Sequence, residues 1–134
     1  MCLYLFWYIM AYIESPRLVL DVRFYATGTG MEPVREWLRS LAHDTRKIIG
    51  EDIKTVQLGW PLGMPLVRNL EPGLWEVRIN LPRGIARIFF TVAGNVMVLL
   101  HGLIKKTQQT PRQDLELARK RMKEVRHGQE QSHR

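Results

Sequence analysis

The chain has one cysteine, Cys2, among 134 residues, so it can form no internal disulfide and offers no cysteine set for a structural zinc ion. Its most apolar stretch, residues 1–13, is shorter than the roughly 20 residues that a membrane-spanning helix needs. A phosphate-cradling loop is lacking as well, because Thr27-Gly28-Thr29-Gly30 has neither the required spacing nor a following Lys-Ser/Thr. These absences argue against a disulfide scaffold, a transmembrane protein and a P-loop enzyme. They favour a reducing, cytoplasmic setting, and no metal or cofactor is expected.

The N-terminal segment MCLYLFWYIMAYI also lacks the basic region and the small-residue cleavage site of a signal peptide. It can be an anchor at a membrane surface, an additional strand, or the product of a start codon assigned too far upstream, with Met10 as the true start. Nothing downstream depends on it, which favours the last interpretation. We therefore expect an apolar extension over residues 1–17, one domain over 18–126 and a disordered tail over 127–134.

Acidic residues are few relative to basic ones: the chain has 13 Asp and Glu and 20 Lys and Arg, which gives a net charge of +7. Residues 105–134 hold nine of the basic and four of the acidic residues, a net +5. A basic balance concentrated at one end favours a polyanionic partner such as nucleic acid.

Before the central segment, apolar alternation predicts a strand over Leu18–Tyr25. A helix is expected to start near Pro33, and a second to be capped by Asp44 and to end at Gly59. Residues 60–65 predict a rigid connector into the sheet. Helical spacing assigns the buried faces of the two helices to Val34, Trp37, Leu38 and Leu41, and to Ile49, Ile53 and Val56.

Residues 70–106 predict three consecutive antiparallel strands, divided by turns at residues 81–84 and 93–95. A three-residue loop at the second turn would pair Val92 with Val96 and set Arg87 opposite His101. The first turn needs an even number of loop residues to keep the apolar faces together, and four of them would pair Asn80 with Arg87.

This register places Arg78, Arg87 and His101 on one sheet face, with Lys105 next along that face and Lys106 beside it. Glu76 is the only acid nearby in the sequence, so these cations would repel one another unless an anionic ligand completes the site. The alternative is that the two arginines are solvated on an open sheet face, that the histidine is satisfied within the sheet, and that the lysines merely solubilise a strand end.

A C-terminal helix is predicted from a capping-box pattern, with Thr110 as the N-cap, Pro111 at the first position and Gln113 at the third. Gly128 is expected to end it. Its predicted buried stripe is Leu115, Ala118, Met122 and Val125. We interpret five basic residues as contacts to RNA or the ribosome, with a plain solvated surface as the alternative: Arg68, Arg112, Arg119, Lys120 and Lys123.

Several short segments occur in an order that is similar to the phage-derived branch of the RelE/HigB toxin family, within the RelE/ParE superfamily. They are residues 32–38 (EPVREWL), 73–78 (GLWEVR), 87–90 (RIFF), 99–102 (LLHG), 105–107 (KKT) and 110–111 (TP). The resemblance covers residues 22–124. It implies an α+β fold with two N-terminal helices packed on a small antiparallel sheet and a C-terminal helix.

The resemblance also implies a toxin that cleaves mRNA on the ribosome, without a metal, through the RNA 2′-hydroxyl. Its expected partners are mRNA, the ribosome with its rRNA, and a helix-turn-helix antitoxin with which it would form an oligomer. By position, Arg78 and Arg87 match the strand cations of the family's site and Lys105 and Lys106 match its basic pair. His101 is the candidate for proton transfer, because imidazole titrates near neutrality.

One departure from the family pattern is that no tyrosine follows Tyr25, whereas RelE-type members commonly carry one late in the chain. The alternative is therefore a protein of the same fold that does not cleave RNA, either a gyrase inhibitor like the ParE branch or an inactive phage-derived binding protein. For the nuclease, we expect Arg87→Ala to abolish growth arrest and to leave the fold intact.

Overall fold

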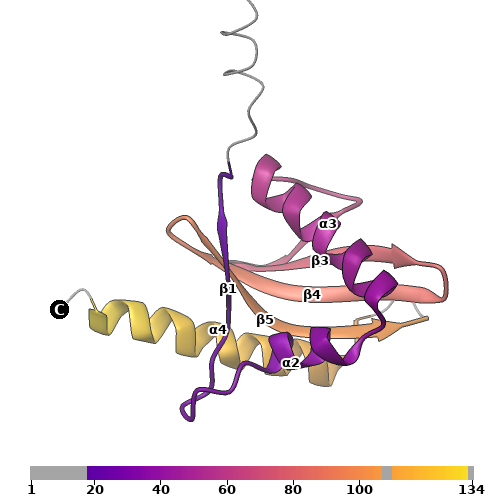
Figure 1. Cartoon of the computed structure of the whole chain (residues 1–134). Coiled ribbons are helices and arrows are strands. Elements are labelled where there is room, and N and C mark those ends of the chain that lie inside the picture. The colour runs from indigo at the N-terminus through magenta and orange to yellow at the C-terminus, as the bar shows by residue number, and fades with distance from the viewer. Residues whose placement is uncertain (1–17, 107–109, 133–134) are drawn as a thin grey trace, which may run out of the picture.

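The structure is a computed structural model that describes residues 18–106 and 110–132, so the apolar extension expected over residues 1–17 lies outside the described part. The element order along the chain is shown in Figure 1. It is β1 (Asp21–Phe24), α2 (Pro33–Ser40), α3 (His43–Gly59), β2 (Val67–Glu71), β3 (Leu74–Leu81), β4 (Gly84–Ala93), β5 (Val96–Lys105) and α4 (Arg112–Ser132).

The five strands form one mixed sheet in the order β1-β5-β4-β3-β2. The three predicted central strands are β3, β4 and β5, and they pair antiparallel as expected. The expectation of a purely antiparallel sheet is wrong, because β1 pairs parallel with β5. The strand β2 was not predicted; Arg68 lies in it, where an edge strand of five residues pairs with β3.

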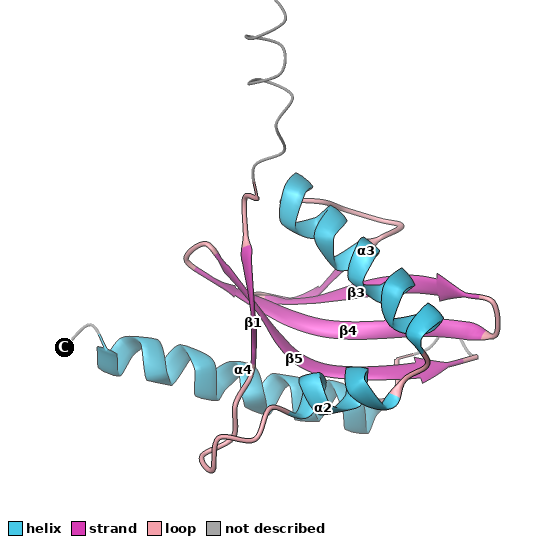
Figure 2. Ribbon diagram, viewed as in Figure 1, coloured by secondary structure: helices cyan, strands magenta, loops and turns pink. Residues whose placement is uncertain are grey.

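Helices cover both faces of this sheet. Helices α2 and α3 lie on one face and α4 lies on the other, as the ribbon view shows (Figure 2). Two hydrophobic clusters result, one on each side: Ile49, Val56 and Phe90 belong to the first, and Phe89 and Met122 to the second. The part of the chain that the structure describes is thus α+β, with three helices of which one is C-terminal.

The helix predictions hold at the level of buried faces. Val34, Ile49, Ile53 and Val56 are buried as expected, and Pro33 begins α2. The predicted cap at Asp44 is wrong. Helix α3 starts at His43, two residues earlier than a cap at Asp44 would give, and its N-cap Ala42 makes no side-chain capping bond. Asp44 instead lies in the first turn, where its charge suits the helix dipole.

Helix α4 also differs at both ends. Thr110 precedes the helix, which starts at Arg112, and its hydroxyl bonds to residues of the sheet instead of capping. The helix continues through Gly128 to Ser132, so neither the predicted end nor the predicted disordered tail is correct for residues 127–132. The predicted stripe does face the sheet, with Ala118 and Met122 buried. None of the described helices is long and apolar enough to cross a membrane.

Both hairpins are tighter than predicted. Leu81 pairs with Gly84, so the first loop has an even number of residues, as expected, but Arg78 rather than Asn80 lies opposite Arg87. In the second hairpin Ala93 pairs with Val96, because Gly94, at φ 63°, permits a tight turn. A bulge between Phe89 and Phe90 shifts the register once more.

Candidate functional site

The side chains predicted to form the site lie on the sheet face that α4 covers. The strand pairing arranges them in three rows across β3, β4 and β5. The rows are Asn80, Ile85 and Lys105; Arg78, Arg87 and Leu103; and Glu76, Phe89 and His101. The predicted sharing of one face is therefore confirmed, but Arg87 lies opposite Leu103 instead of His101.

The second and third rows contain a buried ionic network. Glu76 and Arg87 are both 0% exposed, and Arg87 Nη1 lies 3.1 Å from Glu76 Oε1. The Thr110 hydroxyl donates to Glu76 Oε2 at 2.8 Å and accepts from Arg87 Nη1 at 2.9 Å. Arg78 Nε lies 3.5 Å from the same carboxylate. The alternative of solvated arginines on an open face is wrong for Arg87, because α4 covers this face and the carboxylate of Glu76 neutralises part of the charge.

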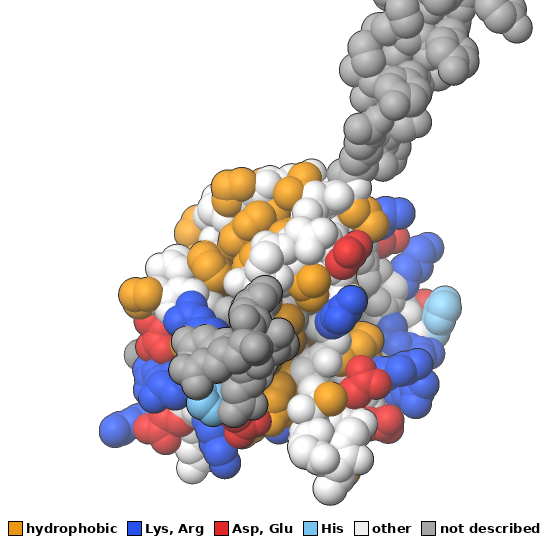
Figure 3. All heavy atoms as spheres, turned by 90° about the vertical axis from the view of Figure 1, so that its left-hand side faces the viewer, with side chains coloured by type: hydrophobic (Ala, Val, Ile, Leu, Met, Phe, Trp, Pro, Cys, Tyr) orange, Lys and Arg blue, Asp and Glu red, His pale blue; other side chains and the backbone are white. Residues whose placement is uncertain are grey.

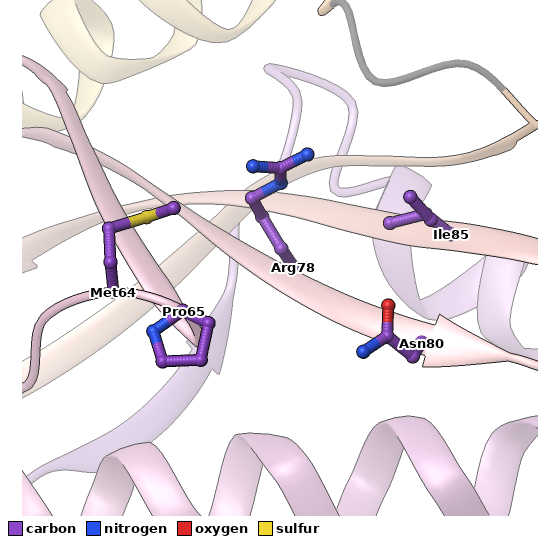
Figure 4. A pocket seen from close by; sticks show the side chains of 5 residues that line it. All are labelled: Met64, Pro65, Arg78, Asn80 and Ile85. Atoms are coloured by element: carbon purple, nitrogen blue, oxygen red, sulfur yellow. The ribbon is translucent and has the colours of Figure 1, made fainter.

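Arg78 opens onto a shallow pocket of about 160 Å³. Figure 4 shows its side chain rising from β3 between Met64 and Pro65 on one side and Ile85 on the other, with Asn80 beside it. Lys105 pairs with Ile85 across β4 and β5, and its side chain is exposed at the end of the strand. A guanidinium and an amide thus line one concave surface, and a lysine follows on the strand next to Ile85, a set of donors that suits a phosphate.

His101 faces a different environment. Its Nε2 lies 2.6 Å from Asp114 Oδ1 in the first turn of α4, and its ring stacks on Phe89 at 5.9 Å between centroids. Two strand spacings, roughly 10 Å, separate β5 from β3. The structure therefore brings Arg78 and Arg87 together and sets His101 two strands away from Arg78.

Most of the other predicted residues lie at the surface. The side chains of Lys106, Arg68, Arg112, Lys120 and Lys123 are exposed. Arg119 instead forms a two-pronged ion pair with Glu71, with nitrogen–oxygen distances of 2.8 and 2.9 Å. The hydrogen bond from Arg119 lowers the pKa of Glu71. Figure 3 shows one side of the molecule, where Lys and Arg lie interspersed with Asp and Glu instead of forming a patch of one sign.

Sequence reasoning missed Asp114, Thr110 and Arg121 as parts of this region. A signal for two of them was present, because Asp114 and Arg121 flank the buried Ala118 at helical spacing and so share its side of α4. The sequence pattern indicates Thr110 only as a helix cap. Within the described residues, no three His, Cys, Asp or Glu side chains are grouped as a metal site would require.

Residues 36–123 match the family model described as Phage derived protein Gp49-like (DUF891). The chain belongs to this family. The Gp49-like family is related to RelE/HigB-like toxins, and its matched region contains every residue that the sequence analysis assigned to the site. A comparison with curated proteins finds no similar sequence.

Proposed function

We propose that this Gp49-like protein is the toxin of a toxin–antitoxin pair and an endoribonuclease that cleaves mRNA on the ribosome without a metal. The observation that carries the proposal is the pocket of Arg78 and Asn80 beside Lys105, in a chain of a toxin-related family. The proposed partners are mRNA, the ribosome and a helix-turn-helix antitoxin, and the proposed setting is the cytoplasm.

Cleavage through the 2′-hydroxyl needs alignment, stabilisation of negative charge and proton transfer. The 2′-oxygen attacks the adjacent phosphorus, the bond to the 5′-oxygen breaks, and one proton leaves the 2′-hydroxyl while another reaches the 5′-oxygen. In our proposal Arg78, Lys105 and Lys106 stabilise the charge on the phosphate oxygens. The side chain of His101 remains the candidate for proton transfer, and only a substrate that extends across the start of α4 reaches both it and Arg78.

Arg87 has a different role in this proposal. Its side chain is buried against Glu76, which also lies beside Arg78 Nε. We therefore assign Arg87 as a positioning residue that holds Glu76, and through it Arg78, in place. Arg87→Ala is unsuitable as a test of catalysis, because removal of one partner of a buried ion pair also destabilises the fold.

The better test compares wild type with Arg78→Gln by primer extension on cellular mRNA after a pulse of expression. We expect cuts within translated codons in wild type and a loss of about 10²–10³ in cleavage rate in the variant, because one donor to the developing charge is gone. Arg83→Gln, in the exposed turn between β3 and β4, is the matched control and should cut like wild type.

A second candidate function is inhibition of DNA gyrase without RNA cleavage. Two observations favour it: Arg87 is fully buried, and no tyrosine follows Tyr25. Growth arrest with intact messages, together with inhibition of supercoiling by the purified protein, would replace the nuclease proposal with this one.

A further inference from the structure

A second cleft lies at the outer edge of β5, on the far side of the sheet centre from the Arg78 pocket. Strand β1 pairs only with residues 96–99 of β5, so within the described chain no strand covers the outer edge at His101 and Gly102. Helix α2 borders this edge on one side and α4 on the other. The cleft has a volume of about 180 Å³ and is lined by Pro33, Val34, Trp37, His101, Gly102 and Arg121.

One wall of the cleft is flat and apolar. Pro33, Val34 and Trp37 come from the first two turns of α2. The indole of Trp37 lies directly on the strand backbone, because a Cβ atom on Gly102 would be only 2.5 Å from Trp37 Cζ3. A flat aromatic and aliphatic wall is a stacking surface that accepts any planar ring, including a nucleobase.

The opposite wall is polar and cationic. Arg121 Nη1 donates to the carbonyl of Leu100 at 2.8 Å, and its guanidinium lies 5.1 Å from the centre of the Tyr25 ring. An arginine has five N–H groups, so this fixed guanidinium can still donate to an anion in the cleft. The residues that line the cleft include no Asp or Glu. The nearby carboxylate of Asp114 contacts His101 and lies outside the lining.

We propose that this cleft binds one nucleotide of an RNA chain, with the base against the Trp37 wall and a phosphate on Arg121 beside His101. The inference rests on the proposed function and adds a nucleotide site separate from the Arg78 pocket. Thr110, just before α4, bonds to Glu76 and Arg87, and Asp114 in the first turn of α4 contacts His101. In this proposal a single RNA strand that crosses the start of α4 occupies both sites. This arrangement explains how a substrate held at Arg78 can also reach His101.

Binding of mononucleotides tests the inference without any nuclease activity. The four nucleoside 3′-monophosphates are titrated into the full-length protein, and the indole N–H signal of Trp37 and the imidazole signals of His101 are followed by NMR. We expect both residues to shift together with one saturation curve. Arg121→Gln should weaken binding at least about tenfold, because a charge-assisted hydrogen bond is lost.

Arg126→Gln is the matched control, since it removes an exposed arginine from the same helix and should leave the affinity unchanged. If Arg121→Gln fails to fold, the wild-type titration decides alone. Absence of shifts at millimolar nucleotide overturns the inference. Equal shifts with inorganic phosphate alone would also overturn it, since they would indicate a simple anion site.

The experiments can contradict the proposed nuclease function and the proposed nucleotide site independently of each other. Intact mRNA with normal nucleotide shifts would contradict the nuclease and leave the cleft as a nucleotide site. Cleaved mRNA without nucleotide shifts would contradict the cleft and leave the nuclease.

Discussion

The side chain of Arg87 is fully buried and lies 3.1 Å from an equally buried Glu76 carboxylate. When two charges are buried in this way, removal of one of them destabilises the fold, because the other is left buried without its partner. Their hydrogen bonds to Thr110 tie the loop before α4 to the centre of the sheet.

Arg87→Ala should therefore lower the free energy of unfolding by about 3–5 kcal/mol, because it leaves the Glu76 carboxylate buried with reduced compensation. Urea denaturation of the purified variant measures this loss. The double variant Glu76→Gln/Arg87→Met should recover much of the stability, since it removes both charges. A single variant as stable as wild type would show that Glu76 can be satisfied without Arg87.

The sequence could not distinguish Arg78 from Arg87. Both lie on the same face of adjacent strands, and the pairing sets them directly opposite each other. Only the path of the chain before α4 decides that Arg87 is covered and that the side chain of Arg78 stays 16% exposed beside a pocket. The covering contacts come from residues more than 20 positions away, which no local pattern reports.

At the scale of elements, α4 is fixed to the sheet at points along its length. Arg119 pairs with Glu71 of β2, Arg121 donates to the Leu100 carbonyl of β5, and Glu124 accepts a hydrogen bond from Tyr25 next to β1. The bond to Glu124 raises the pKa of Tyr25. These contacts reach both edges of the sheet, so they hold α4 across the face that contains the candidate site.

The ion pair of Glu71 predicts a pH-dependent contribution to stability. Its pKa is lowered in the folded state, chiefly by the hydrogen bond from Arg119, so folding is favoured while the carboxylate is ionised. This contribution is complete above the ordinary pKa of a glutamate and disappears as the pH falls through the lowered value. Glu71→Gln should therefore be less stable than wild type at neutral pH, and the difference should vanish in acid.

Thermal melts of both proteins across this pH range measure the effect. Glu36→Gln is the control, because its ion pair with Arg39 is more than half exposed on both sides and contributes little. A Glu71→Gln difference that stays constant from neutral pH into acid would contradict the assignment.

At the scale of the whole molecule, the basic residues behind the net charge of +7 have different roles. Some cations hold the fold, as Arg87 and Arg119 do, and others remain exposed on α4. If the exposed ones contact RNA phosphates, binding must weaken with salt in proportion to their number. A triple variant of the exposed α4 residues separates the two uses: Arg112→Gln/Lys120→Gln/Lys123→Gln.

We expect this variant to bind single-stranded RNA more weakly and to reduce the slope of log K against log salt by about 2, at about 0.7 per lost contact. Filter binding at several salt concentrations measures it. The control removes three exposed cations from α2 and α3 on the opposite face: Arg39→Gln/Arg46→Gln/Lys47→Gln. Equal slopes in both variants would contradict an RNA-binding role for α4.

The sequence by itself determined the helices, the three central strands and the sharing of one sheet face by Arg78, Arg87 and His101. These features follow from residue periodicity and turn chemistry, which act over a few positions. Hairpin register was only partly determined, because the bulge after Phe89 and the tight turn at Gly94 each move the pairing.

Only the tertiary structure decided that β1 pairs parallel with β5, that α4 lies over the cationic face, and that Glu76 and Asp114 meet Arg87 and His101 there. Each of these depends on contacts between distant segments. Charge balance inside a protein is set by which segments pack together, so a cluster of cations in the sequence becomes a site, or a buried ion pair, only when the fold closes over it.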